Sequence, residues 1–409
     1  MKLNRFILVV LFISTILKAD ELESRFNYFG NAMVSKLDNS NYTLHNYNTD
    51  NIDNKVRIVP NSKLGIQYAL YNDKWTFITQ VVGSKNHGKY VANLAWLNAK
   101  YNINENYYVR IGKIQTPFLL SSDTRSIDYL QLWTKMPGEI DRVSPVESYT
   151  GIEFSYQGTI NDEYDFNIVV LPLSKSNVKI NTNNSGRSNL KVNDANSIVL
   201  SLNTDDLKVK TSYSQMNFYL KDNNVYLKTI KNRLTAYGYD MSKYSMENKK
   251  FEIYTFSVGY NYEDYILQAE IVRLKADVLY PSKTAGYAML GYRYESFTPY
   301  FIYSRSRDDT SHFNTDLIVP IDATSTALKS GLNQFLYSAA NSSEVTKSIG
   351  LNYSLSTTAT LKLQMDKTTF KYNGTTSSTQ VRTYGTFEKN SGIEPDSVYT
   401  YTMSISFAF

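Results

Sequence analysis

The chain has 409 residues, with 43 Lys or Arg against 38 Asp or Glu and a formal net charge of +5 at pH 7. It contains no cysteine, which excludes a disulfide framework and thiolate chemistry, and it has no concentrated basic stripe of the kind that binds nucleic acid. Its 35 Tyr exceed Phe and Trp together. Tyrosine collects where a protein wall passes from lipid to water, so this bias is typical of a membrane protein.

Residues 1–19 predict a secretory signal peptide. Lys2 and Arg5 form its basic start, residues 6–17 its apolar run, and Ala19 ends a cleavage site. The run is too short for a transmembrane helix, although an uncleaved anchor remains the alternative. Loss of residues 1–19 would reduce the net charge to +2, and residues 20–409 are expected to form one domain.

Beyond this segment, the chain alternates apolar and polar side chains in sixteen stretches. Alternate residues of a strand point to opposite faces, so each stretch predicts a β-strand. The predicted strands span residues 24–35, 57–70, 75–84, 90–101, 107–115, 149–157, 164–172, 196–202, 207–219, 249–260, 265–275, 284–294, 299–307, 345–354, 359–371 and 397–409. Short polar turns alternate with connections that are mostly longer, which is the pattern of outer-membrane β-barrels. We expect 173–195 to be one of the long loops, and both chain ends to lie on the periplasmic side.

The faces of these strands favour lipid outside and water inside. In the segment 359–371, Leu361 and Leu363 would face lipid, whereas Lys362 would face the lumen. A Lys or Arg on the lipid face near the bilayer midplane costs about 2–4 kcal/mol, but the same charge in a water-filled lumen costs little. Sixteen strands leave an aqueous channel, whereas a small barrel fills its interior with side chains. The sequence therefore predicts an all-β fold, a 16-stranded antiparallel transmembrane β-barrel.

The third outer connection, residues 116–148, combines apolar, aromatic and charged residues, including Phe118 and Trp133. An exposed loop tip would not need such apolar content, so we expect this loop to fold inward against the barrel wall. The last strand, 397–409, ends on an aromatic residue. It resembles the closing strand of bacterial outer-membrane barrels, and that resemblance implies that Phe409 is an assembly signal for the barrel-assembly machinery.

The region around the third loop carries a more specific resemblance. Residues 108–118 read Tyr-Val-Arg-Ile-Gly-Lys-Ile-Gln-Thr-Pro-Phe, and residues 149–156 read Tyr-Thr-Gly-Ile-Glu-Phe-Ser-Tyr. Over about fifty residues this region resembles the porin-like proteins of Gram-negative bacteria, nearest the phosphate-selective porin O/P-like and dicarboxylate-channel group. The matching positions are Arg110, Gly112, Lys113, Thr116 and Pro117. The resemblance implies an outer-membrane porin for passive diffusion of small hydrophilic solutes and ions, often a homotrimer.

Pore selectivity depends on width and on rings of charged side chains. The predicted constriction residues are Arg110, Asp123, Arg125, Asp128, Lys135, Glu139, Asp141 and Arg142, and the predicted pore-wall residues are Lys100, Glu153, Lys208, Lys210, Glu270, Arg293, Lys362 and Asp366. The loop carries a net charge of −2, which does not favour phosphate selectivity, and it would face a mainly basic wall. This arrangement predicts a transverse field across the pore. The alternative is that the charges only hold the loop to the wall.

Different classes of protein fit the sequence less well. A barrel enzyme would need a nucleophile beside a base. The three histidines, His45, His87 and His312, all fall in predicted loops or at their edges, and the sequence contains no Gly-x-Ser-x-Gly elbow. We therefore expect no enzyme activity, no cofactor and no metal. An outer-membrane adhesin or structural barrel, a secreted β-sandwich and a plugged receptor stay open as rivals to a porin.

Overall fold

The computed structural model describes residues 22–44, 51–58, 62–86, 89–143, 146–182, 186–220, 225–245, 247–276, 281–309, 322–339, 342–372, 383–384, 387–389 and 397–409. The predicted signal peptide and the three histidines lie outside these residues. No helix within the described ranges is long and apolar enough to cross a membrane.

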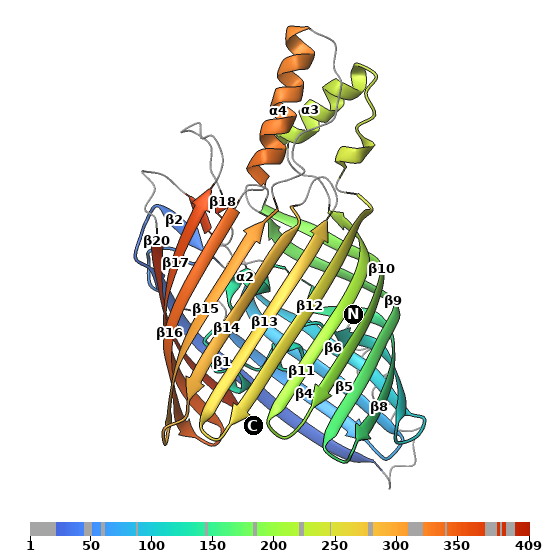
Figure 1. The fold of residues 1–409 in the computed structure, drawn as a ribbon, viewed down its shortest axis with the longest axis vertical. Helices are drawn as coiled ribbons and strands as arrows, with labels where there is room; N and C mark the ends of the chain where they lie inside the picture. Colours follow the sequence, from blue (N-terminus) through green and yellow to red (C-terminus); the bar gives the residue numbers. More distant parts are fainter. Residues whose placement is uncertain are drawn as a thin grey trace.

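Sixteen long antiparallel strands and one two-residue strand form a single closed sheet (Figure 1). The long strands are β1 (Glu23–Leu37), β4 (Lys63–Tyr71), β5 (Trp75–Asn86), β6 (Lys89–Asn102), β7 (Tyr107–Gln115), β8 (Ser148–Ile160), β9 (Tyr164–Thr182), β10 (Gly186–Asn203), β11 (Leu207–Leu220), β12 (Lys249–Tyr262), β13 (Tyr265–Ala276), β14 (Lys283–Tyr292), β15 (Phe297–Asp308), β16 (Ser342–Ser356), β17 (Ala359–Tyr372) and β20 (Ser397–Ala408). Each pairs with its neighbours along the chain, and β1 pairs with β20 to close the barrel. The prediction of sixteen antiparallel strands is confirmed.

Two predicted boundaries were wrong. Residues 173–195 are not a long loop, because β9 and β10 continue as a paired hairpin over most of that range. The segment predicted at 57–70 is divided into β3 (Arg57–Ile58), which pairs with Val34 and Ser35 of β1, and β4, which begins at Lys63. The alternation of apolar and polar residues marks the part of a strand that faces lipid. It does not show how far paired strands extend beyond the membrane.

The junction between the first and last strands is closed by main-chain and aromatic contacts. Phe409 donates its N–H to the carbonyl of Tyr28 at 2.8 Å, and Tyr28 donates to the carbonyl of Phe409 at 3.0 Å. Their rings stack with centroids 4.9 Å apart. The ladder between β1 and β20 therefore runs from Tyr28 to Leu37, whereas Glu23 to Asn27 of β1 pair with β4 alone.

The two ends of the barrel differ. One end carries short turns such as 72–74 and 263–264, and we call it the short-turn end. The opposite end, which we call the long-loop end, carries α3 (Val225–Ala236) and α4 (Ala323–Ala339), which stand above the barrel in Figure 1. The same end holds a small sheet of β2 (Tyr42–Leu44), β18 (Thr383–Tyr384) and β19 (Phe387–Lys389). This sheet joins the first and last loops, because β2 pairs with β19.

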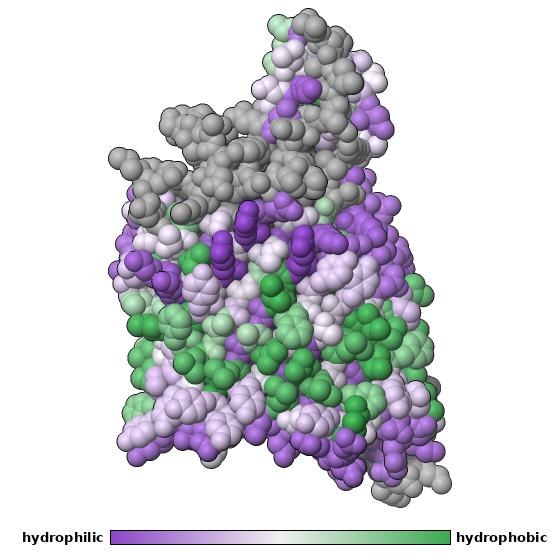
Figure 2. All heavy atoms as spheres, viewed as in Figure 1, coloured by the Kyte–Doolittle hydropathy of each residue, from purple (hydrophilic) through white to green (hydrophobic). Residues whose placement is uncertain are grey.

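The outer surface carries an apolar belt. Figure 2 shows hydrophobic residues gathered at mid-height, with hydrophilic residues above and below. Exposed members of the belt include Ile111, Phe154, Ile271, Ile349 and Met403. Aromatic pairs surround the short-turn end: Trp75–Tyr101, Tyr107–Tyr156, Tyr265–Tyr292 and Phe297–Tyr353, with ring centroids 4.6–5.1 Å apart. An apolar band bordered by aromatic residues matches the outer surface of a transmembrane barrel.

Candidate functional site

Residues 116–147 connect β7 to β8 and pack against the inward face of the barrel. The loop contains three short helical turns, η2 (Ser122–Thr124), η3 (Asp128–Leu130) and α2 (Gly138–Asp141). Its apolar side chains lie in one buried cluster with inward-facing residues of β8 to β15. Phe118, Leu119, Trp133 and Ile140 are each at most 3% exposed. The ring of Trp133 meets that of Tyr287 on β14 edge-on, with centroids 5.6 Å apart.

Polar side chains of the wall hold the first part of this loop. Glu270 on β13 accepts the N–H of Leu120 at 3.2 Å. Lys210 on β11 donates to the carbonyl of Leu119 at 3.1 Å. Both wall residues are buried, at 3% and 5% exposure. They therefore act on the loop backbone and are not open to a solute.

A second set of contacts holds the middle of the loop. Lys362 on β17 donates to the carbonyls of Asp128 and Gln131 and, at 3.4 Å, to that of Trp133. Close by on the same strand, the side-chain oxygen of Gln364 accepts the N–H and the hydroxyl of Thr134 at 3.1 and 3.0 Å. Lys362 is fully buried, so this lysine is also an anchor of the loop.

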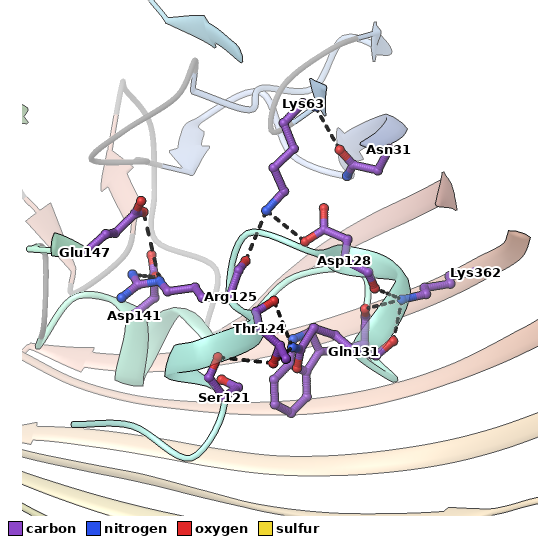
Figure 3. A network of polar contacts seen from close by, with 11 residues as sticks. Asn31, Lys63, Ser121, Thr124, Arg125, Asp128, Gln131, Asp141, Glu147 and Lys362 are labelled. Atoms are coloured by element: carbon purple, nitrogen blue, oxygen red, sulfur yellow. Dashed lines mark hydrogen bonds and ion pairs between the residues drawn. The ribbon is translucent and has the colours of Figure 1, made fainter. Parts of the chain in front are cut away.

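The loop tip is fixed by ion pairs that Figure 3 shows from close by. Lys63 at the start of β4 lies 2.9 Å from the carboxylate of Asp128 and donates to the carbonyl of Arg125 at 3.2 Å. The guanidinium of Arg125 pairs with Asp141 at 2.5 Å and lies 3.9 Å from Glu147. Burial favours the neutral form of Arg125, but these carboxylates outweigh it and raise the pKa. Sequence reasoning missed Lys63, although alternation with Leu64 and Ile66, which are exposed on the outer face, indicates that Lys63 faces inward.

Glu139, in α2, has a different environment. It is 3% exposed, beside the carboxylate of Glu344 on β16. Burial, and then the charge of Glu344, raise the pKa of Glu139 to about 7. Glu139 therefore lies against the wall and does not face an open constriction.

The accessible charges of the wall lie on β6, β7 and β11. Arg110 on β7 keeps 29% of its side chain exposed and lies 3.5 Å from Glu153 on β8. Lys100 on β6 and Arg110 both stand over the ring of Tyr108, at 4.7 and 5.4 Å from its centroid. Lys208 on β11 is half-buried, and its side chain forms no ion pair or hydrogen bond with any residue that the structure describes. Lys100, Arg110 and Lys208 form the group that we call the basic wall.

The remaining predicted residues are dispersed. Asp123 is exposed on the loop and is the acid that acts most strongly on Lys210. Lys135 and Arg142 are half-buried on the loop, and Asp366 is buried, where it accepts a hydrogen bond from Gln364 at 2.6 Å. Arg293 is not part of the wall. It follows the last residue of β14 and donates to the carbonyl of Glu263 at 3.2 Å, in the turn at the short-turn end.

These contacts divide the charged side chains of the wall into two groups. Lys63, Lys210, Glu270 and Lys362 hold the loop, as expected if charges on the loop and wall serve to attach one to the other. Lys100, Arg110 and Lys208 keep accessible side chains, and Asp123, Asp141 and Glu147 are acids of the loop that stay at least partly exposed. The loop packs against the wall from β8 to β17 and leaves Lys100, Arg110 and Lys208 accessible.

Comparison with known proteins shows the fold. No family model matches the chain, and no curated protein matches it. Among solved structures, it is similar to the outer membrane channel DcaP of Acinetobacter baumannii, with 10% identity, 96% of this chain and 99% of that chain covered, and a TM-score of 0.54. An anion-selective porin from Comamonas acidovorans aligns with 12% identity, over 95% of this chain and 100% of that chain, with a TM-score of 0.51.

A trimer form of OmpT, an outer membrane protein of Vibrio cholerae, aligns with 11% identity over 95% of this chain and 100% of that chain, with a TM-score of 0.54. These likenesses extend over almost the whole of each chain. The fold is therefore that of the outer-membrane porins.

Proposed function

We propose that this protein is an outer-membrane porin, a water-filled channel for passive diffusion of small hydrophilic solutes and ions. The inward-packed loop 116–147 supports this proposal most strongly, because a loop held against the inner wall would form a constriction while the basic wall stays accessible. The apolar belt supports a position in the outer membrane of a Gram-negative bacterium, reached by export through residues 1–19.

Within this proposal, the channel favours anions. Lys100 and Lys208 carry positive charge without a paired carboxylate among the described residues, and Arg110 adds a guanidinium that Glu153 partly neutralises. A ring of positive charge attracts anions and repels cations at a constriction. This preference agrees with the resemblance to anion and dicarboxylate channels, but the net charge of the loop gives no support for phosphate in particular. The transverse field that we propose lies between the basic wall and the accessible acids of the loop, among them Asp123.

The same proposal includes assembly. The resemblance and the trimer form of OmpT support a homotrimer, and the contacts of Phe409 with Tyr28 support a role for Phe409 in recognition by the barrel-assembly machinery. A homotrimer predicts channel closure in three equal conductance steps.

Planar-bilayer recording of the purified protein tests the channel itself. We expect stable ohmic single-channel steps, and liposome swelling with sugars of rising size should show a cut-off. A folded protein that inserts into bilayers without conductance would instead indicate an adhesin or a structural barrel.

A further inference from the structure

The outer face of the barrel carries an apolar groove beside the junction of its first and last strands. The groove has a volume of about 620 Å³ and lies across β16, β17, β20 and β1. Its apolar lining includes Ile349, Leu363, Met365, Tyr401 and Met403. Leu363 and Met403 are opposite each other in the ladder between β17 and β20 and are 43% and 45% exposed, so the groove opens toward lipid. Water is absent from the hydrocarbon core of a membrane, and the natural occupant of such a groove is an acyl chain.

Three lysines border the groove on the side of the long-loop end. Lys36 on β1 is part of the lining itself. Lys347 and Lys367 come two residues beyond Ile349 and Met365 on the same faces of β16 and β17, which is about 7 Å along a strand. All three lysines are exposed on the outer face, and none of them forms an ion pair with a described residue.

Two of these lysines are direct neighbours across the ladder. Lys347 on β16 pairs in register with Lys367 on β17, and like charges directly opposite each other destabilise a sheet. Lys367 also lies over the ring of Tyr399, with its ammonium nitrogen 5.4 Å from the ring centroid. An anion placed between the two ammonium groups would remove their repulsion.

The lysines belong to a row of basic side chains directly above the apolar belt. Arg273 on β13 and Arg305 and Arg307 on β15 are exposed on the outer face, near the long-loop ends of their strands. Figure 2 shows hydrophilic residues gathered at this height over β13 to β15. Basic side chains at the level of lipid headgroups attract anionic lipids. Long loops of a transmembrane barrel are extracellular, so this row would meet the headgroups of the outer leaflet.

We propose that the groove binds one molecule of lipid A, the phosphorylated lipid of the outer leaflet, with an acyl chain in the groove and a phosphate between Lys347 and Lys367. The proposal rests on the outer-membrane position proposed above. Lysine binds phosphate as a compact positive charge, and Lys36 lies where it reaches the same headgroup. A zwitterionic lipid fits less well, because its own ammonium group neutralises its phosphate.

Native mass spectrometry of the full chain in detergent tests this site. After exchange into lipid-free detergent, the wild type should retain one added diphosphoryl lipid A per chain and should bind phosphatidylethanolamine much more weakly. Lys347→Gln combined with Lys367→Gln should weaken lipid A binding about tenfold, because the charges that face the phosphate are lost. Lys347→Arg combined with Lys367→Arg should retain binding. Leu363→Trp should weaken it, because the indole ring would fill the groove.

The matched control is Arg273→Gln combined with Arg307→Gln. It removes two charges from the same row but leaves the groove intact, so it should bind lipid A as the wild type does. An equal loss in the two glutamine double variants would show diffuse attraction by the row and would overturn the site. Equal binding of phosphatidylethanolamine and lipid A by the wild type would overturn it as well, as would a second copy of the chain that covers the groove and excludes lipid.

A second readout guards against variants that fail to fold. Lipid A should raise the thermal unfolding midpoint of the wild type and of the arginine double variant, and it should have a smaller effect on the glutamine double variant at Lys347 and Lys367. Binding is measured in detergent, independently of conductance. A chain that conducts in planar bilayers but retains no lipid A would therefore overturn the lipid site and leave the proposed porin function intact.

Discussion

The ammonium group of Lys63 lies 2.9 Å from the carboxylate of Asp128, and this pair connects the second long strand to the tip of the inward loop. The same tip is held from another strand by Lys362, which donates to three of its carbonyls. Two lysines that face the lumen thus determine where the loop lies. Their charge acts on the protein and not on a passing solute.

Replacing Lys362 with Met should loosen the loop. Loss of the ammonium group leaves buried carbonyls without a donor, and each such group costs about 1–3 kcal/mol. We expect faster tryptic cleavage at Arg125 and Lys135 and greater noise in the open-channel current. Lys347→Met is the control, because Lys347 on β16 is exposed on the outer face, and it should behave as the wild type. Equal cleavage rates in both variants would contradict the anchoring role of Lys362.

Trp133→Ala should release the apolar side of the loop. Trp133 is 3% exposed and packs against Tyr287, and truncation of a buried Trp costs about 3–5 kcal/mol. The expected result is a lower denaturation midpoint in guanidinium together with a larger single-channel conductance. Leu130→Ala provides the comparison, since Leu130 on the same loop is 55% exposed and should leave both measurements nearly unchanged. A conductance that stays at the wild-type value in Trp133→Ala would show that the loop does not narrow the pore.

Gly350→Ala should disturb the anchor around Gln364. The ring of Tyr300 occupies the space that a Cβ at position 350 would take, and its hydroxyl donates to Gln364 at 2.9 Å. Displacing that ring should cost about 1–3 kcal/mol, as overpacking usually does. Gly83→Ala is a matched control, because a Cβ there meets only the carbonyl of Leu64 at 3.6 Å. Thermal unfolding followed by circular dichroism compares the two, and equal midpoints would count against this account.

The sequence predicted the strands well because lipid and water impose opposite demands on alternate residues. Every one of the sixteen alternating segments overlaps a long strand of the barrel. The hairpin extension of β9 and β10 was missed because strands beyond the belt need not alternate. Helices α3 and α4 were not expected, since the long loops that carry them have no such constraint.

The candidate site was less predictable from the sequence. Alternation placed Lys362 and Lys100 on the inward face, and the structure agrees. It could not show that Lys362 meets the backbone of the loop while Lys100 meets only an aromatic ring and open lumen. That difference depends on how a loop of thirty or so residues packs across the barrel, which no local pattern records. Arg293 shares the inward alternation but lies past the end of its strand.

Phe409→Ala should lower the yield of folded barrel. The change removes the ring that stacks on Tyr28, although the main-chain bonds between these residues remain available. The fraction of heat-modifiable protein in outer-membrane preparations measures this yield. Phe297→Ala, which removes another aromatic ring at the short-turn end, should have a smaller effect. Pores that do assemble from Phe409→Ala should conduct as the wild type does, and a changed conductance would contradict an assembly role.

The anion preference depends on the basic wall. Arg110→Ala would leave the buried carboxylate of Glu153 without its partner, so Lys100 and Lys208 offer a cleaner change. The variant Lys100→Gln with Lys208→Gln removes two accessible positive charges and leaves the anchors of the loop in place. Arg293→Gln is the control, since its guanidinium binds the turn near Glu263.

The most direct test is the reversal potential across a planar bilayer with a KCl gradient. We predict anion preference in the wild type and in Arg293→Gln, and a shift toward cation permeation in the double variant. A reversal potential that is the same in the double variant and the wild type would contradict the claim that the basic wall sets the selectivity of this channel.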